Sequence, residues 1–121
     1  MAFDITWEPK GVCKTYSGFV TSQEFMQSIA KFQGDPRFDD CRYSLNDMTA
    51  VEGHSITESD VKRFAAFAIG AFHSNPNVRI AVVATDPSIL TLLDLYTAPG
   101  HSPYPMRIFP ALAEARAWLA N

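Results

Sequence analysis

The sequence predicts one α/β domain over residues 1–121, with a mostly parallel mixed sheet and helices packed on it. Two strand patterns open the chain, and helix and strand patterns then alternate to its end, so the expected order is β-β-α-β-α-β-α-β-α. Strand–helix–strand units of this kind give parallel neighbours joined by right-handed crossovers. A chain of 121 residues also buries enough apolar surface to fold without disulfides or metals.

The composition is that of a globular protein and argues against several classes of function. The hydrophobic fraction is 47%, and 10 basic against 13 acidic residues give a net charge of -3. Basic residues do not cluster, so we expect no nucleic-acid surface. No apolar run approaches the ~18 residues of a membrane span and no signal peptide opens the chain, so we expect a cytoplasmic protein. Cys13 and Cys41 form no C-x-x-C motif and are expected to be small buried side chains.

The first elements are an antiparallel hairpin and a helix. Phe3, Ile5 and Trp7 alternate with polar residues, as in a half-buried strand. Residues 8–11 (EPKG) suit a type I turn, and a second strand covers about 12–19. The next segment, 21–24 (TSQE), is a capping box that begins a helix, and residues 34–36 (GDP) end it.

Strands and helices alternate from there. A third strand is expected over residues 42–48, and a loop over 49–55. Thr57, with Asp60 three residues later, caps a second helix that ends at 75–77 (NPN). The remaining elements are a buried strand at 78–84, a helix begun by Asp86 and Pro87 that runs to about Tyr96, a short strand at 106–109 and a final helix opened by Pro110.

Short turn, strand and helix signals follow one another in a characteristic order along nearly the whole chain. They are the stretches 16–21 (YSGFVT), 35–38 (DPRF), 43–47 (YSLND), 79–83 (RIAVV), 107–109 (RIF) and 114–119 (EARAWL). In these stretches the chain resembles the STAS domains, and within them the SpoIIAA-like group related to bacterial anti-sigma-factor antagonists. The resemblance implies the STAS fold and a non-catalytic, regulatory binding module.

The resemblance also implies a phosphorylation switch. STAS antagonists carry a phosphorylatable serine at the N-terminus of the helix after the third strand, usually in an Asp-Ser-Ser-Gly run. Here Asp47 matches the acidic position and Thr49 falls on the serine position, with no glycine after it. Ser55 lies nearer the start of the helix. Thr49 and Ser55 are therefore the candidate phosphoacceptors.

Residue types that bind metals or catalyse reactions do not form a motif. His54, His73 and His101 fit none of the usual zinc spacings, so we expect no metal and no cofactor. An enzyme, the least favoured interpretation, requires two of Asp47, His54 and His101 to converge.

The second and third helices are more apolar than packing on a sheet requires. Each carries apolar residues over an arc of about 200°, where one buried face needs about 100°. Three explanations stay open: the helices cover each other, they form a homodimer interface, or they enclose a pocket for an apolar ligand such as a lipid tail. The candidate interface or pocket residues are Asp47, Phe64, Phe67, Ala71, Leu92, Leu95 and Tyr96. Phe67 and Ala71 are expected beyond the core stripe, and Phe67, Leu92 and Leu95 in an exposed lining.

These observations favour an interaction module that binds a protein partner, or a second copy of itself, through the second helix and the loop before it. The alternative is a small protein that binds an apolar, lipid-like molecule.

Overall fold

A computed structural model describes residues 2–98 and 102–120 and contains one five-stranded sheet. Its strands lie in the order β1 (Phe3–Glu8), β2 (Gly11–Val20), β3 (Tyr43–His54), β4 (Arg79–Val83) and β5 (Met106–Phe109). The β1–β2 pair is antiparallel and the other three pairs are parallel. This confirms the mostly parallel mixed sheet and the predicted order of elements.

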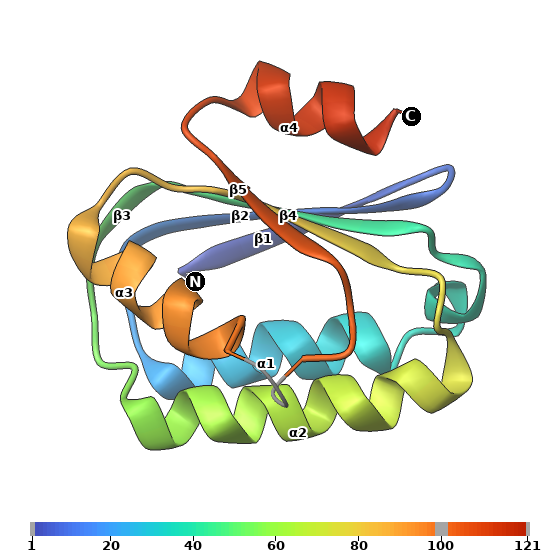
Figure 1. Cartoon of the computed structure of the whole chain (residues 1–121), viewed down its shortest axis with the longest axis horizontal. Helices are drawn as coiled ribbons and strands as arrows, with labels where there is room; N and C mark the ends of the chain where they lie inside the picture. The colour runs from blue at the N-terminus through green and yellow to red at the C-terminus, as the bar shows by residue number, and fades with distance from the viewer. Residues whose placement is uncertain (1, 99–101, 121) are drawn as a thin grey trace.

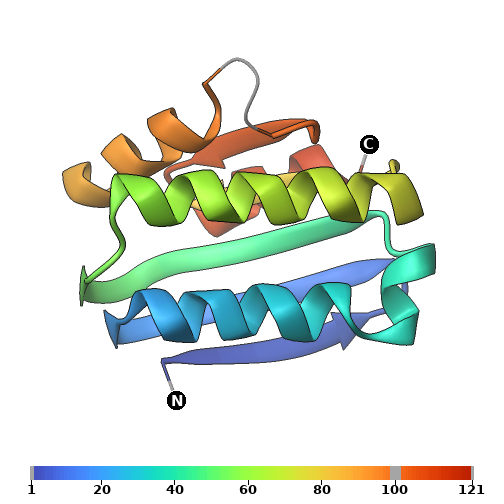
Figure 2. The ribbon, with the colours of Figure 1, turned by 90° about the horizontal axis from the view of Figure 1, so that it is seen from below.

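Helices cover the two faces of the sheet unequally. Helices α1 (Ser22–Gln33), α2 (Glu58–Ser74) and α3 (Pro87–Tyr96) lie on one face, and α4 (Leu112–Leu119) lies alone on the other (Figure 1). Seen from the side of the three helices, α1 and α2 run side by side across the sheet (Figure 2). The layer between these helices and the sheet is therefore the main hydrophobic core.

The predicted starts of α1, α2 and α3 are confirmed because local hydrogen bonds fix them. Thr21 accepts a hydrogen bond from the backbone N–H of Glu24 at 3.1 Å, and Glu24 accepts in return from the N–H of Thr21 at 3.1 Å. Thr57 and Asp60 form the same reciprocal pair at the start of α2. Asp86 caps α3 by accepting from the N–H of Ser88 at 2.8 Å.

Two predicted boundaries are wrong, and one short helix was not predicted. Most of the predicted loop 49–55 is strand, because β2 continues far enough for residues up to His54 to pair with it across two register shifts. Gly18, at φ 67°, lies at the second shift, where only a glycine adopts this backbone conformation without strain. A 3₁₀ helix, η1 (Pro36–Asp40), follows α1, and α4 begins at Leu112 and not at Pro110.

Side-chain alternation along the strands separates two cores. On the side of α1, α2 and α3, the fully buried Tyr16 shares a 2.7 Å hydrogen bond with Ser28 of α1. On the other side, α4 buries Ala115 and Leu119 against a small apolar cluster. The members of that cluster from the sheet are Leu45, Ala81, Val83 and Phe109.

Polar contacts hold α4 in place at both ends of its packing surface. Arg116 donates two hydrogen bonds to the Glu8 carboxylate, at 2.7 and 2.8 Å, and Tyr43 donates its hydroxyl proton to the same carboxylate. Arg79 donates to the carbonyl oxygens of Trp118 and Leu119 at 2.9 and 2.8 Å, which satisfies the last turn of the helix.

Gly11→Ala should lower the free energy of unfolding by about 1–3 kcal/mol. A Cβ at this position would lie 2.5 Å from the Tyr43 ring, which its hydrogen bond to Glu8 holds in place. Gly70→Ala is the matched control, because its Cβ would meet nothing within 4 Å in the middle of an exposed helical face. It should raise stability by about 0.5–1 kcal/mol. Urea denaturation of both variants checks the pair, and equal effects would contradict this packing.

Candidate functional site

A cavity of about 120 Å³ lies between the sheet and the three helices that cover it. Its walls are almost entirely apolar, with aromatic rings from α1, α2 and α3 above and branched side chains from the strands below. The apolar lining includes Phe25, Ile29, Phe32, Met48, Phe64, Ile80, Val82, Leu92, Leu93 and Tyr96. Three polar side chains rise from the strands into this space: Lys14, Ser44 and Asn46. A concave apolar site with a few polar groups is the usual form of a small-molecule site.

Lys14 is the most unusual residue of the cavity. It lies on the helix-facing side of β2 with only 4% of its surface exposed, between the buried Val12 and Tyr16. Its ammonium lies 5.0 Å from the centre of the Phe32 ring. Burial lowers the pKa of Lys14 to about 8, since the neutral amine suits an apolar environment better than the ammonium does.

No described residue supplies Lys14 with a counter-ion. The nearest candidate is the Cys41 thiol, but it donates its proton to the carbonyl oxygen of Tyr43 at 3.0 Å, and burial raises its pKa. Within residues 2–98 and 102–120, every fully buried side-chain nitrogen or oxygen atom has a hydrogen-bond partner. The ammonium has none among these residues, so it must reach the open space of the cavity.

Asn46 lies directly beside Lys14, because the parallel register of β2 and β3 pairs these two residues. Its amide nitrogen donates toward the backbone oxygens of Ser44 and Ala81, both at 3.3 Å, and lies 3.2 Å from the Ser44 hydroxyl. Two carbonyl acceptors fix the orientation of the amide. Asn46 also lines the cavity.

A buried asparagine joins three segments beside the cavity, next to the lining residues Phe38 and Tyr104. The amide of Asn75, the C-cap residue of α2, donates to the carbonyl oxygens of Phe38 and Cys41, both at 2.7 Å. Tyr104 donates its hydroxyl proton to the carbonyl oxygen of Asn75 at 2.7 Å. These bonds join η1, α2 and the segment before β5, so this side of the cavity is rigid.

The structure brings together three of the residues proposed from the sequence. Phe64, Leu92 and Tyr96 all line the cavity, from α2 and α3. Phe64 is 4% exposed and its ring lies 4.9 Å from that of Phe25 on α1.

The other proposed residues lie elsewhere. Ala71 is buried in the core, because it follows Phe64 and Ala68 at helical spacing, so its expected place beyond the core stripe is wrong. Asp47 points to the α4 face, since it alternates with the inward Asn46 and Met48. Phe67 is exposed as expected but faces solvent, and Leu95 is half-buried; neither lines the cavity.

Sequence reasoning missed Lys14, Ser44 and Asn46. One signal was present for Lys14: it shares strand parity with Val12 and Tyr16, so the alternation that buries those two residues also buries the lysine.

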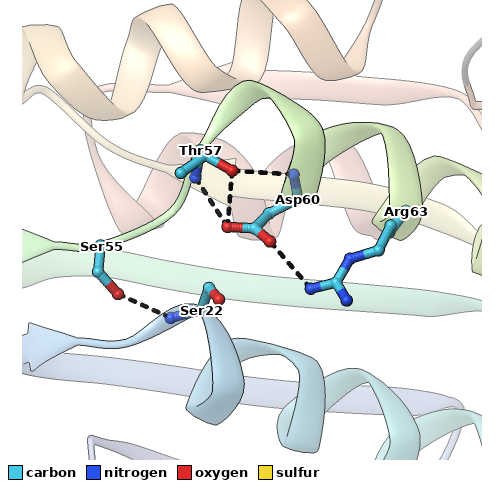
Figure 3. Close-up of polar contacts among 5 residues, drawn as sticks. All are labelled: Ser22, Ser55, Thr57, Asp60 and Arg63. Atoms are coloured by element: carbon cyan, nitrogen blue, oxygen red, sulfur yellow. Dashed lines mark hydrogen bonds and ion pairs between the residues drawn. The ribbon is translucent and has the colours of Figure 1, made fainter.

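The two candidate phosphoacceptors occupy different environments. The Ser55 hydroxyl accepts from the backbone N–H of Ser22, in the first turn of α1, at 3.1 Å and lies two residues before Thr57, the N-cap of α2 (Figure 3). The starts of two helices thus meet beside Ser55. Thr49 lies within β3, where its hydroxyl donates to the Asp47 carboxylate at 2.7 Å.

The proposed catalytic and metal-binding residues do not form a described cluster. His54 accepts from the backbone N–H of Ile56 through Nδ1, while the Asp47 carboxylate is occupied by Thr49, and His101 lies outside the described residues. Among the residues that the structure describes, no three His, Cys, Asp or Glu side chains gather as a metal ion requires. Over the same residues, no helix combines the length and apolar character needed to cross a bilayer.

Structural comparison identifies the fold. The chain superposes on the unphosphorylated form of the anti-sigma factor antagonist SpoIIAA with a TM-score of 0.67, at 11% sequence identity, covering 99% of both chains. The chain has a SpoIIAA-like fold. It also matches a DUF3478-family protein with a SpoIIAA-like fold from Shewanella loihica PV-4, with a TM-score of 0.58 and 18% identity over 98% of this chain and 92% of that one. By sequence, no family model and no curated protein matches the chain.

Lys14→Met should stabilise the protein at pH 7, because it replaces a buried cation with an apolar side chain of similar length. Lys14 titrates at about 8 in the folded protein and at 10.5 in an unfolded chain, so the unfolded state binds more protons between these pH values. The free energy of unfolding of the wild type should therefore rise over this window, while that of the variant should not. The gap between the two, about 3 kcal/mol in favour of the variant at pH 7, should close toward pH 10.5. Urea unfolding from pH 7 to 10 measures the gap, and a pH-independent gap would contradict the buried cation.

Ser55→Asp should raise the free energy of unfolding by about 0.5 kcal/mol, because a negative charge there faces the starts of α1 and α2. Thr49→Asp is the control at the other candidate position and should lower stability by a similar amount, since it adds a charge beside Asp47. Both effects should shrink in 1 M salt. If both variants raised the free energy of unfolding in low salt, or both lowered it, the electrostatic difference between the two positions would be refuted.

Proposed function

We propose that this protein is a non-catalytic regulatory module of the STAS type that binds a protein partner through the outer face of α2 and residues 55–57 before it. The observation that carries the proposal is the exposure of large apolar side chains on α2. Phe67 is 50% exposed and Ile69 46%, although both lie in the middle of a 17-residue helix. Large apolar side chains exposed on a helix are typical of interaction sites.

The arrangement of the outer face of α2 suits a helical partner. At about 100° per residue, Phe67 and Ile69 fall on opposite edges of the exposed arc, with the small residues Ala66 and Gly70 between them. The charged residues of α2 lie at its start, where Arg63 pairs with Asp60 at 2.9 Å and Glu58 and Lys62 are exposed. An amphipathic helix with a central apolar stripe complements the apolar part of this face.

Gly70 supports close approach by such a partner. A glycine inside a helix costs up to about 1 kcal/mol relative to alanine. A side chain at this position would meet no other atom within 4 Å, so packing within the chain does not account for the glycine. Contact with a partner's backbone does account for it.

The likeness to SpoIIAA supports a regulatory role, since that protein is an antagonist of an anti-sigma factor. Of the two candidate phosphoacceptors, Ser55 is the better one, because a phosphate there would face the N–H groups at the starts of two helices. It would also stand at the N-terminal end of the proposed interface and alter its charge. Thr49, beside Asp47, would place phosphate against a carboxylate.

Phe67→Asp and Ile69→Asp should abolish partner binding while changing the free energy of unfolding by less than about 0.5 kcal/mol. Leu112→Asp is the matched control, because Leu112 is 43% exposed but lies on α4, across the sheet. The tagged chain and its variants are expressed in the cells of origin, and the bound proteins are compared by quantitative mass spectrometry.

A partner that the Leu112 variant retains and both α2 variants lose would support the proposal. Identical sets of bound proteins for all variants would refute it. A wild-type dimer in light scattering that Phe67→Asp makes monomeric would show that the partner is a second copy of the chain.

A second candidate function, binding of a small apolar molecule, is favoured by the cavity beneath the helices. Its 120 Å³ is somewhat smaller than an apolar protein cavity of about 150 Å³ that holds benzene. The expected ligand is therefore a molecule of about five to eight non-hydrogen atoms. The lipid tail expected from the sequence is too large for this space.

A further inference from the structure

We propose that the cavity beneath α1, α2 and α3 is a binding site for a small apolar carboxylate, held by an ion pair to the Lys14 ammonium. The assignment deepens the second candidate function, on which it rests. The apolar part of the ligand would lie against Phe25, Phe64 and Leu92, and its carboxylate would lie at the strands beside Asn46.

The charge of Lys14 carries this assignment. Moving an ammonium from water into an apolar interior is unfavourable unless the charge is paired. The contact found among the described residues is a cation–π interaction with Phe32, 5.0 Å from its ring centre, which offsets only part of this desolvation. Lys14 is 4% exposed and has no hydrogen bond or ion pair among the described residues, so a large part of the cost stays uncompensated. A bound anion would compensate it.

A merely structural role does not account for the lysine. A methionine or leucine would fill the same place on β2 without the desolvation cost. Many buried lysines extend along an apolar surface until the ammonium reaches water. Here the stem runs from the middle of the sheet into a cavity covered by three helices, and the ammonium lies beside an aromatic ring. The lysine therefore places its charge inside the cavity.

Lys14 is the one cationic side chain of the described lining, so the cavity can pair with a single anionic group. The amide nitrogen of the neighbouring Asn46 is engaged by the backbone oxygens of Ser44 and Ala81. The remaining lining is apolar apart from Ser44 and Gln33, so the rest of the ligand must be apolar as well.

The titratable groups around Lys14 stay neutral near pH 7. They are Cys41 after η1, Tyr96 on α3 and Tyr104 before β5, and burial raises the pKa of each, that of Tyr104 to about 12. Neither α1 nor α2 contributes a titratable side chain to the lining. Lys14 is thus the group in the described lining whose charge changes between pH 7 and pH 9.

The test compares 3-methylbutanoate with its neutral amide, 3-methylbutanamide, which has the same number of non-hydrogen atoms. Binding of each is followed by amide chemical shifts in ¹H–¹⁵N spectra of wild type, Lys14→Met and Lys62→Met at pH 7. Lys62 is an exposed lysine on α2 and controls for loss of one positive charge. Wild type and Lys62→Met should bind the carboxylate at least about tenfold more tightly than the amide, and Lys14→Met should lose this preference.

A second arm uses wild type alone and does not depend on any variant. Affinity for 3-methylbutanoate should fall about tenfold from pH 7 to pH 9 as Lys14 loses its proton, while affinity for the amide should not change.

Equal binding of both probes at the cavity would overturn the ion pair but leave the second candidate function standing. Binding of neither probe would overturn both. A carboxylate preference that survives in Lys14→Met, or shifts confined to residues outside the cavity, would assign the anion to another part of the surface and contradict the proposal.

Discussion

The parallel register of β2 and β3 decides which side chains meet beneath the helices. It sets Lys14 opposite Asn46, and because side chains alternate along a strand, it also sends both toward α1 and α2. A shift of one residue would bring Asp47 to the helix side and would give Lys14 a carboxylate partner. The cavity would then contain an internal ion pair. The unpaired cation, and with it the chemistry proposed for the site, follows from this register.

Helix α2 separates the two proposed binding surfaces. Its inner face contributes Phe64 and Ala68 to the cavity, and its outer face exposes Phe67 and Ile69. Both faces are apolar, which is why the sequence pattern alone leaves self-coverage, dimerisation and a pocket open. On the other face of the sheet, α4 packs on a small apolar cluster and is held by its contacts with Glu8 and Arg79.

Local signals predicted the fold well, because helix caps, turns and strand alternation depend on neighbouring residues. The capping boxes at Thr21 and Thr57 are formed as expected. The length of β3 was not predictable in this way, since its second half forms only by pairing with β2 across two register shifts.

The site was predicted in part. Phe64, Leu92 and Tyr96 line the cavity. Strand parity places Lys14 on the same side of β2 as Val12 and Tyr16, but the depth of its burial depends on how α1 lies over β2, which this local pattern does not encode.

Lys14 is a buried cation in the cavity, and no described residue pairs with it. NMR titration of the Lys14 side chain, through its ¹³Cε resonance, measures this directly. The account predicts a pKa of about 8 in the free protein and a higher pKa, by about one unit or more, with saturating 3-methylbutanoate, because a nearby anion favours the ammonium. A Lys14 pKa near 10.5 in the free protein, or one that the carboxylate leaves unchanged, would contradict it.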